Sequence, residues 1–385
     1  MTTTPDDDEP RAERAERTAR HAAMPSMQLL RSLTDEHVLT AVIEHGRLTR
    51  AEISATTGIS KPTISESVRR LCAIGLVADT GERTTGRGRI GSYFALADDV
   101  GGALVVSVAP EGVVAETLDA HGEVTSRATE RVGRPVGPAQ IAQALDATAR
   151  RARRGPIRLA VVSAADPVDR RTGRLVHLPD APFLVGDLSP VERLAEWVDG
   201  QVVVDNDVNW AARAEQAASG LDDFVYVHLG EGLGAAVVND GEVRRGHSGL
   251  VGEIAHVLTL GPQRRAMPFT EVFAALGLRH AGSTAIDVDA VAAAGEARAT
   301  VARAVCGVLA AAVAFADPEL VVIGGAWGPA FVEPIATEFR HLPRHVPVRA
   351  ARVTDQPALT GAGQHALREL RATINAMARS RSNPG

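Results

Sequence analysis

The sequence predicts an α/β protein in two parts: a winged helix-turn-helix over residues 27–97, and a larger domain of two α/β lobes over residues 98–385. Two observations predict this division. Three short amphipathic helices and a β-hairpin follow one another before residue 97, and beyond it apolar strands alternate with alanine-rich helices. Residues 1–26 mix acidic and arginine-rich runs with few apolar positions, which is typical of a disordered tail.

Composition excludes several classes of protein. The chain has 385 residues, a net charge of −6 and 45% hydrophobic residues, which suits packed domains. We expect a cytoplasmic protein, because no run approaches the roughly 18–20 apolar residues that span a bilayer and the acidic start MTTTPDDDEP is unlike a secretion signal. Cys72 and Cys306 lie too far apart in sequence for a CxxC metal site. Lys61 is the only lysine, which excludes a Walker-type phosphate loop.

The pattern of the first part predicts three helices separated by turn residues. DEHVLTAVIEHG, residues 35–46, places its apolar side chains on one helical face and ends at a glycine. In the second helix, Thr49 and Glu52 have the spacing of a capping box. The third begins at Ser60 as N-cap, with proline in its first turn. Two apolar strands around a loop rich in glycine and arginine complete a winged helix-turn-helix.

The third helix and the loop carry the candidate DNA-binding residues. A helix fits the major groove, and its N-terminal side chains meet the base edges. Arginines on a narrow glycine-rich loop suit the minor groove. The alternative is a protein-interaction module whose arginines form a solvated face. The order of the helices, the short turn and the basic wing together favour DNA binding over this alternative. The candidates are Lys61, Thr63, Ser65 and Glu66 for bases, Arg69 and Arg70 for phosphates, and Arg83, Arg87 and Arg89 on the loop.

The second part alternates apolar strands with helices, as α/β domains do. The expected strands are residues 102–108, 113–119, 158–164, 201–205, 224–230, 234–240 and 320–325, and the expected helices are residues 141–153, 208–219 and 299–316.

The stretch QVVVDNDVNWAARAE at residues 201–215 and the stretch FVYVHLGEGLGAAVVNDGEVRRGHSGLVGEIAHV at residues 224–257 carry a family resemblance. With the winged helix, they resemble the ROK family (repressors, open reading frames, kinases), in particular its xylose-type and N-acetylglucosamine-type repressors. The resemblance extends over roughly residues 27–375. It implies an actin-like, sugar-kinase-type fold with a cleft between two lobes.

The resemblance also implies an effector site. Carboxylates and amides suit the hydroxyl groups of a sugar, because they form short, directional hydrogen bonds with them. Two alternatives remain open: Asn206 and Asp207 could cap the helix that follows, and Glu253 could pair with an arginine. The implied effector-binding residues are Asn206, Asp207, Glu253 and His256 in GEIAH, Glu271 in FTEVF, and Asp180 at the asparagine of the family's P-N element.

The departures from the family pattern argue against phosphoryl transfer. The D-x-G-G-T loop of the kinases corresponds to SVAPE at residues 107–111, and their G-T-G-I-G loop to GEGLG at residues 230–234. Glu111 and Glu231 therefore place negative charge where the resemblance puts phosphates. The stretch directly after His256, VLTLGPQRRAMPFTE, contains no cysteine, so the zinc cluster that the resemblance implies at this place cannot form. We expect no catalysis, no zinc and no ATP.

Together these features predict a DNA-binding transcriptional regulator, a repressor, whose second domain senses a sugar or sugar derivative. Its expected partners are a double-stranded DNA operator, the sugar effector and further copies of itself as a homodimer or homotetramer, because one winged helix reads few base pairs. The alternatives are a ROK sugar kinase with an added DNA-binding domain, and a ligand-independent regulator with a decayed pocket.

Overall fold

The computed structural model describes residues 27–85, 90–133, 137–178, 186 and 188–381. These residues belong to two compact units. The first unit contains the chain up to Val100 together with its end from Ala372 on, and the second unit contains Gly101–Arg371. The predicted tail, residues 1–26, lies outside the described residues.

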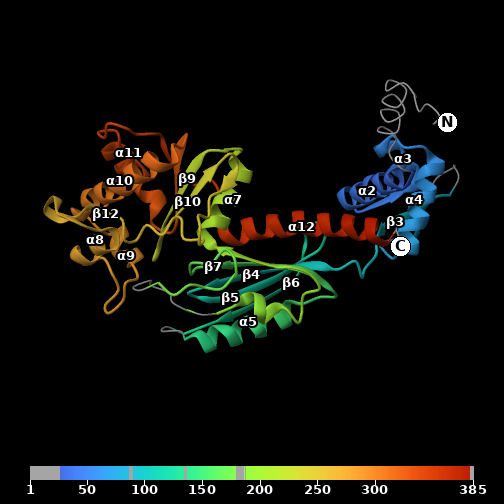
Figure 1. The fold of residues 1–385 in the computed structure, drawn as a ribbon, viewed down its shortest axis with the longest axis horizontal. Coiled ribbons are helices and arrows are strands. Elements are labelled where there is room, and N and C mark those ends of the chain that lie inside the picture. The colour runs from blue at the N-terminus through green and yellow to red at the C-terminus, as the bar shows by residue number, and fades with distance from the viewer. Residues whose placement is uncertain (1–26, 86–89, 134–136, 179–185, 187, 382–385) are drawn as a thin grey trace, which may run out of the picture. The chain divides into compact units, whose positions relative to one another are not determined.

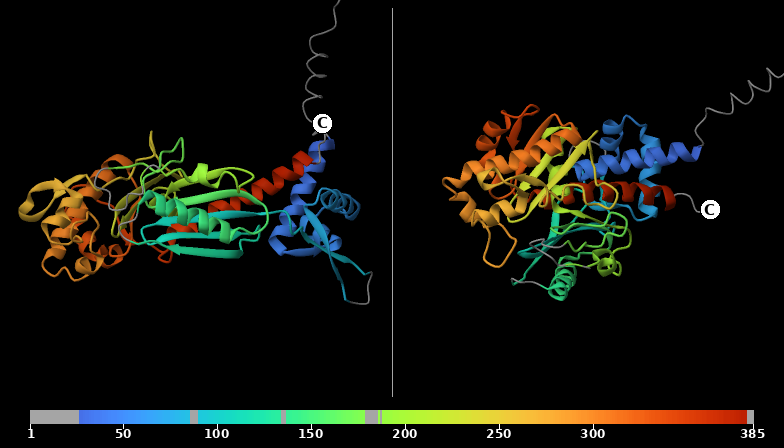
Figure 2. Two further views of the ribbon diagram at one scale, coloured as in Figure 1. Left: turned by 90° about the horizontal axis from the view of Figure 1, so that it is seen from below. Right: turned by 60° about the vertical axis from the view of Figure 1, so that its left-hand side comes forward.

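The first unit combines helices with a three-stranded antiparallel sheet in the order β1-β3-β2 (Figure 1). Within this unit, the hairpin of β2 and β3 extends away from the helices (Figure 2). The first helix begins at Met27, earlier than the sequence predicts, and the short strand β1 was not predicted. The elements are α2 (Met27–His45), β1 (Arg47–Thr49), α3 (Arg50–Thr57), α4 (Lys61–Ala73), β2 (Val77–Arg83) and β3 (Ser92–Leu96).

Local capping explains where these helices begin. The Thr49 side chain accepts a hydrogen bond from the Glu52 backbone N–H, and the Glu52 carboxylate accepts one from the Thr49 N–H, which confirms the capping box. Ser60 caps α4 by accepting from the backbone N–H of Thr63 at 3.4 Å. The apolar faces of α2 and α4 form the core of the unit, with Val38, Leu39, Val42, Ile64, Val68 and Leu71 buried.

The first lobe of the second unit is a five-stranded sheet in the order β6-β5-β4-β7-β8, with β4, β7 and β8 parallel. Helix α5 covers β5 and β6 on one face (Figures 1 and 2). Strand β6 was not predicted, because its polar sequence alternates between exposed and half-buried positions. The elements are β4 (Gly102–Ala109), β5 (Gly112–Leu118), β6 (Val124–Arg131), α5 (Pro138–Ala152), β7 (Ile157–Ala164), α6 (Pro190–Leu194) and β8 (Val202–Asn206).

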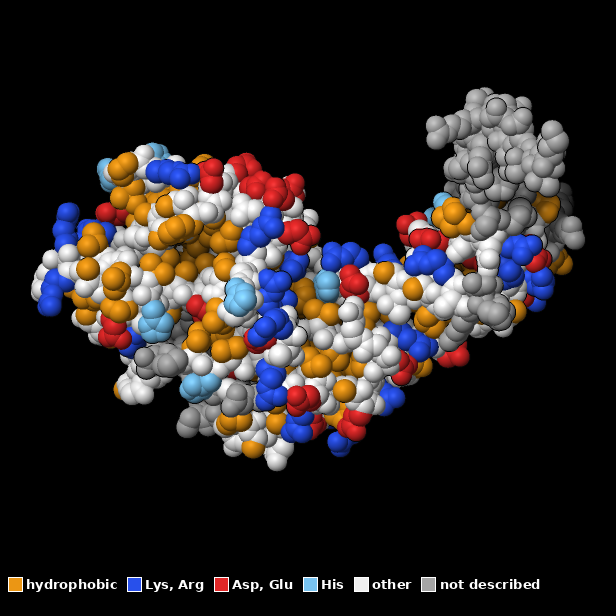
Figure 3. Space-filling model, in the orientation of Figure 1, with side chains coloured by type: hydrophobic (Ala, Val, Ile, Leu, Met, Phe, Trp, Pro, Cys, Tyr) orange, Lys and Arg blue, Asp and Glu red, His pale blue; other side chains and the backbone are white. Residues whose placement is uncertain are grey.

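The second lobe is another five-stranded sheet, in the order β11-β10-β9-β14-β15, accompanied by the small pair β12 and β13. On the face drawn in Figure 3, arginine and acidic side chains lie next to one another over the surface of the second unit. The elements are α7 (Asp207–Ser219), β9 (Phe224–Leu229), β10 (Leu233–Asn239), β11 (Glu242–Val243), β12 (Leu258–Leu260), β13 (Ala266–Pro268), α8 (Phe269–Ala275), α9 (Val288–Ala292), α10 (Ala297–Ala316), β14 (Leu320–Gly324), α11 (Val332–Phe339) and β15 (Val348–Ala350). The last helix, α12 (Pro357–Arg381), belongs to the second unit up to Arg371 and to the first unit from Ala372 on.

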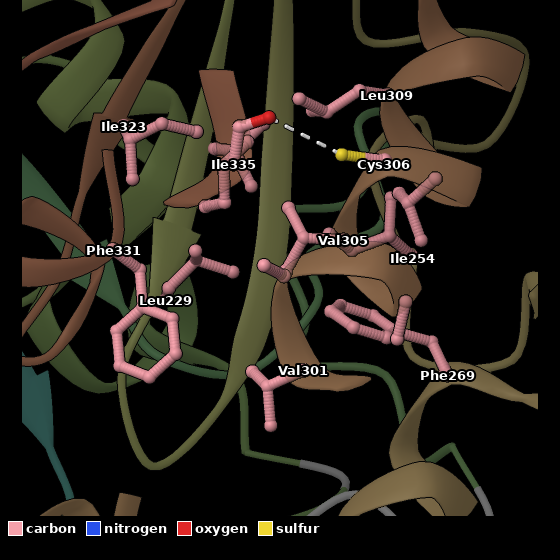
Figure 4. Close-up of a cluster of buried hydrophobic side chains, with 14 of the residues drawn as sticks. Leu229, Ile254, Phe269, Val301, Val305, Cys306, Leu309, Ile323, Phe331 and Ile335 are labelled. Carbon is pink, nitrogen blue, oxygen red and sulfur yellow. Dashed lines mark hydrogen bonds between the residues drawn. The ribbon is translucent and has the colours of Figure 1, made fainter. Parts of the chain in front are cut away.

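Helix α10 is the centre of the second lobe's core. Val301 and Val305 are buried among side chains of the sheet and of neighbouring helices, and Cys306 Sγ donates to the backbone carbonyl of Ile335 at 3.4 Å (Figure 4). Burial raises the pKa of the Cys306 thiol to about 12. By length and composition α10 could cross a bilayer, which the sequence analysis did not foresee. Its buried face instead makes it a core helix of this lobe.

Candidate functional site

The outer face of α4 carries most of the predicted DNA-contacting residues. The buried face of the helix holds Ile64, Ser67, Val68 and Leu71, which leaves the opposite face to solvent. The exposed side chains on that face are Lys61, Thr63, Ser65, Glu66 and Arg69.

Two of these exposed side chains pair with each other. Arg69 Nη2 lies 2.6 Å from Glu66 Oε1, and Arg69 Nε donates to Glu66 Oε2 at 3.1 Å. The hydrogen bond from Arg69 holds the pKa of Glu66 below its usual value. Because both side chains are exposed, the pair contributes little stability and can open when a stronger partner approaches.

Arg70 lies in a different environment from its neighbour. Its Nη2 is 2.6 Å from Asp35 Oδ1 on α2, and Ser67 Oγ donates to the same oxygen at 2.5 Å. Asp35 is 1% exposed. From the sequence Arg70 is expected on a DNA phosphate, but in the structure its guanidinium pairs with Asp35 and holds α4 against α2. This pairing joins residues far apart in sequence, so helical spacing alone could not predict it.

The hairpin that forms the wing is described only in part. Arg83, at the end of β2, is exposed and donates to Asp79 Oδ1 at 2.9 Å. The other two predicted wing residues, Arg87 and Arg89, lie outside the described residues.

The second unit contains a cavity of about 360 Å³. Its lining comes from the segments that follow β4 and β7, from the junction of β8 with α7, from the turn between β9 and β10, and from residues 249–256. Ligands of α/β proteins bind where such strands end. Four predicted effector residues line it: Asn206, Asp207, Glu253 and His256.

The other two predicted effector residues are not brought to this cavity by the described structure. Glu271 lies at the start of α8, is exposed, and pairs with Arg279 Nη2 at 3.2 Å. It is not among the lining residues. Asp180 lies outside the described residues.

Asn206 is a positioning residue for the cavity. Its side chain accepts from the backbone N–H of Val208 at 2.9 Å and thereby caps α7. Its Nδ2 donates to the carbonyls of Ala164 and Asp166 at 3.4 and 3.3 Å. The capping alternative is therefore confirmed for Asn206. These bonds fix the residue that follows, Asp207, at the cavity.

Asp207 and Glu253 both have raised pKa values. Burial, together with the charges of Glu253 and Asp166, raises the pKa of Asp207 to about 7. Glu253 is accessible from the cavity, yet desolvation by the surrounding protein still raises its pKa to about 7. Among the described residues, no arginine pairs with Glu253. The described structure therefore does not support the alternative in which Glu253 pairs with an arginine. Near neutral pH each of these two carboxyl groups is therefore partly protonated.

The raised pKa of Asp207 predicts a pH-dependent stability. Between about pH 4 and 7 the folded chain holds a proton on Asp207 that the unfolded chain has released, so stability falls as pH rises through this window. Asp207→Asn stays neutral throughout. We compare the free energies of unfolding of the variant and the natural chain, measured in urea at pH 5, 6 and 7. We expect the value for the variant to rise relative to that of the natural chain by up to about 1.4 kcal/mol per pH unit. A difference that stays constant with pH would contradict the assigned pKa.

Sequence reasoning missed His228 as a cavity residue. It lies on β9, the sequence of which, FVYVHL, is otherwise apolar or aromatic, and that single polar position was the available indication. Burial lowers the pKa of His228 to about 4, so its ring is neutral at physiological pH. Within the part of the chain that the structure describes, no group of three or more His, Cys, Asp or Glu side chains is arranged to hold a metal ion.

Comparisons with known proteins match both units. Residues 116–267 match the model of the ROK family, and residues 31–78 match a winged helix-turn-helix DNA-binding model. The glucokinase of Streptomyces coelicolor is 30% identical over 40% of this chain and 48% of its own length. The DNA-binding transcriptional dual regulator NagC of Escherichia coli is 23% identical over 61% of this chain and 60% of its own. The chain thus spans about half the length of that glucokinase and 60% of the regulator.

Solved structures show the same fold. A ROK family transcriptional regulator, homologous to the Escherichia coli MLC protein, has a TM-score of 0.59 at 18% identity, over 91% of this chain and 99% of its own. A ROK family glucokinase from Streptomyces griseus, solved with glucose and AMPPNP, has a TM-score of 0.53 at 23% identity, over 70% of this chain and 100% of its own. The predicted winged helix-turn-helix followed by a sugar-kinase-like α/β domain is therefore confirmed.

Proposed function

We propose that this chain, in which a winged helix-turn-helix precedes a domain that matches the ROK family, is a DNA-binding transcriptional repressor whose second domain binds a sugar or sugar derivative without phosphorylating it. The observation that carries this proposal is the outer face of α4, which presents polar and basic side chains on a well-capped helix. The matches to NagC and to the xylose repressor of Caldicellulosiruptor bescii support it.

The cavity residues favour a sensor over a kinase. Glu111 and Glu231 line the cavity, and none of its described lining residues is Lys or Arg. The phosphates of ATP carry several negative charges, which such a lining repels rather than stabilises. We therefore propose that the domain needs neither ATP nor a metal. An assay of ADP release over a hexose panel should give no turnover, and turnover that Asp207→Asn abolishes would support the kinase alternative.

The proposed mechanism is a coupling between effector binding and DNA binding. The effector would occupy the cavity and close the two lobes. In a cytoplasmic homodimer or homotetramer, this closure would change the relative positions of the DNA-binding units. Typical coupling free energies of about 1–3 kcal/mol alter affinity roughly 5–150-fold.

The test of DNA binding uses a matched pair of charge removals. Lys61→Ala/Arg69→Ala removes two basic side chains from the outer face of α4, and Arg153→Ala/Arg154→Ala removes two exposed arginines after α5. By fluorescence anisotropy on a duplex from upstream of the protein's own gene, we expect the first variant to lose at least roughly 10-fold in affinity. We expect the second to bind as the natural chain does. Equal losses, or binding without sequence selectivity, would contradict the proposal.

A further inference from the structure

A half-buried arginine of the second unit lacks an anionic partner among the described residues. Arg213 lies on α7, and its guanidinium forms no ion pair and no hydrogen bond within the described chain. We propose that Arg213 on α7 and Arg368 on α12 bind a phosphate group, either as free phosphate or as part of a phosphorylated small molecule. Both residues belong to the second unit, and neither lines the cavity. The proposed site is therefore separate from the cavity of the effector.

Helices α7 and α12 are in direct contact next to this site (Figure 1). An added Cβ on Gly361 of α12 would lie 2.0 Å from the backbone carbonyl oxygen of Trp210 on α7, so only glycine permits this approach. About one turn further along α12, the ring of His365 lies 5.1 Å from the Trp210 ring, centroid to centroid. The Cζ of Arg213 lies 5.4 Å from the centroid of the same indole. The Trp210 side chain therefore holds residues of both helices at one place.

The described surroundings of Arg213 leave its guanidinium without an acceptor. Its Nε is buried and has no hydrogen-bond partner. Burial, the main cause, lowers the pKa of Arg213, and the charges of Arg368 and Arg245 lower it further. The carboxylates of Asp205 and Glu242 act in the opposite direction from a distance, but Asp205 pairs with Arg245, at 3.3 Å. A polar group in this state costs free energy, so a ligand that brings an acceptor is favoured.

Arg368 and His365 provide further donors beside Arg213. The Nη2 of Arg368 lies 2.8 Å from His365 Nδ1, and because arginine only donates, this nitrogen accepts and the ring proton lies on Nε2. Burial lowers the pKa of His365, and the charges of Arg368 and Arg213 add to this effect, so the ring is neutral near pH 7. Arg368 is exposed and also lies 3.6 Å from Glu369, a distance at which an exposed pair contributes little. Its guanidinium fork is therefore available to an incoming anion.

The donors favour a phosphate group over other anions. Near pH 7 a phosphate group carries close to two negative charges and at least three acceptor oxygens. It can therefore accept from the guanidinium groups of Arg213 and Arg368 and from the His365 Nε2–H, through charge-assisted hydrogen bonds. A carboxylate has one charge and two oxygens, and chloride cannot accept the paired hydrogen bonds of a guanidinium fork. The ring face of Trp210 holds Arg213 in place but offers no acceptor, so it does not replace the ligand.

Titration calorimetry on the full chain, at constant ionic strength, tests the site. The probes are inorganic phosphate, glycerol 3-phosphate, glycerol and acetate. We expect both phosphate-bearing probes to bind at least roughly 10-fold more tightly than acetate, and glycerol not to bind. Arg213→Gln and Arg368→Gln should each weaken phosphate binding at least roughly 10-fold. The control Arg303→Gln removes a half-buried helical arginine of the same unit that pairs with Glu338 at 3.8 Å, and should leave phosphate affinity unchanged.

Thermal unfolding distinguishes an arginine that binds a ligand from one that only stabilises the fold. Without phosphate, we expect Arg213→Gln to melt at or above the temperature of the natural chain, because it removes a half-buried cation that has no partner. Saturating phosphate should raise the melting temperature of the natural chain and of Arg303→Gln, but not that of Arg213→Gln. If Arg213→Gln melts lower without phosphate and binds phosphate as the natural chain does, Arg213 is structural and the proposal is wrong.

The other outcomes decide the remaining alternatives. Phosphate stabilises many proteins through exclusion from their surface, so an equal rise in melting temperature in the natural chain and in Arg213→Gln would contradict a specific site. Acetate that binds as tightly as phosphate contradicts the assigned ligand class. Tighter binding of glycerol 3-phosphate than of phosphate identifies a phosphorylated small molecule as the ligand, and the reverse order identifies the free ion. Because Arg368 is exposed, Arg368→Gln tests the site even where Arg213→Gln does not fold.

Discussion

Asp35→Ala is expected to unfold much of the first unit and abolish DNA binding. Asp35 is 1% exposed, accepts a hydrogen bond from Ser67 and pairs with Arg70 at 2.6 Å. The cost should approach the roughly 3–5 kcal/mol of a broken buried ion pair, because Ser67 loses its acceptor and the half-buried Arg70 keeps only the more distant Glu66, at 3.6 Å. A unit of this size has only about 4–10 kcal/mol of stability in total. Thermal unfolding by circular dichroism and duplex binding by anisotropy measure both effects.

The control for Asp35→Ala is its neighbour on the same helix. Glu36 is only half-buried, with its side chain 40% exposed, and pairs with Arg379 at 3.3 Å within the same unit, so Glu36→Ala should cost less than about 1 kcal/mol. It should also leave DNA affinity nearly intact. If Asp35→Ala melts like the natural chain, the buried network of Asp35, Ser67 and Arg70 does not hold the unit together.

Gly252→Ala is expected to destroy the effector cavity. Gly252 has φ +99°, and an added Cβ would lie 1.8 Å from the backbone carbonyl oxygen of Ala235. The same segment is held to β10 by a hydrogen bond from the Ala235 N–H to the Gly252 carbonyl at 2.9 Å. Strain and overpacking together cost roughly 2–6 kcal/mol, and relief of the overlap must displace the backbone that carries Glu253 and His256. Calorimetry should show at least a 10-fold loss of ligand affinity.

The matched control for Gly252→Ala is a glycine that also has a positive φ but has room for a Cβ. Gly220 ends α7 at φ +71°, and no atom lies within 4 Å of an added Cβ. Gly220→Ala should therefore cost only about 1–2 kcal/mol of backbone strain and leave ligand affinity unchanged. Equal effects of the two variants on ligand affinity would show that close packing at Gly252 is not what shapes the cavity.

The parts of the fold that local sequence determines were predictable. The capping box of Thr49 and Glu52 and the N-cap Ser60 follow from short-range hydrogen bonds, and the structure confirms both. The buried strands of both sheets were predictable from their apolar runs, because strands covered on both faces have no polar side. The resemblance to the ROK family likewise implied one site for Asn206, Asp207, Glu253 and His256, and all four line the cavity.

The features that depend on distant contacts were not predictable in the same way. Arg70 looked like a free cation because its partner, Asp35, lies on another helix. Helix α12 (Pro357–Arg381) was not assigned at all, and its residues from Ala372 on group with the first unit rather than with the domain in which sequence order places them. His228 became a site residue only because the fold directs the end of β9 to the cavity.

The most direct test of the central claim measures DNA release by a cavity ligand. The duplex from upstream of the protein's own gene is titrated with the full chain, with and without a saturating concentration of the tightest-binding sugar of the hexose panel. We expect the sugar to weaken duplex binding roughly 5–150-fold in the natural chain, and Gly252→Ala to bind the duplex but no longer respond to the sugar. A duplex affinity that the bound sugar leaves unchanged would contradict the proposed coupling.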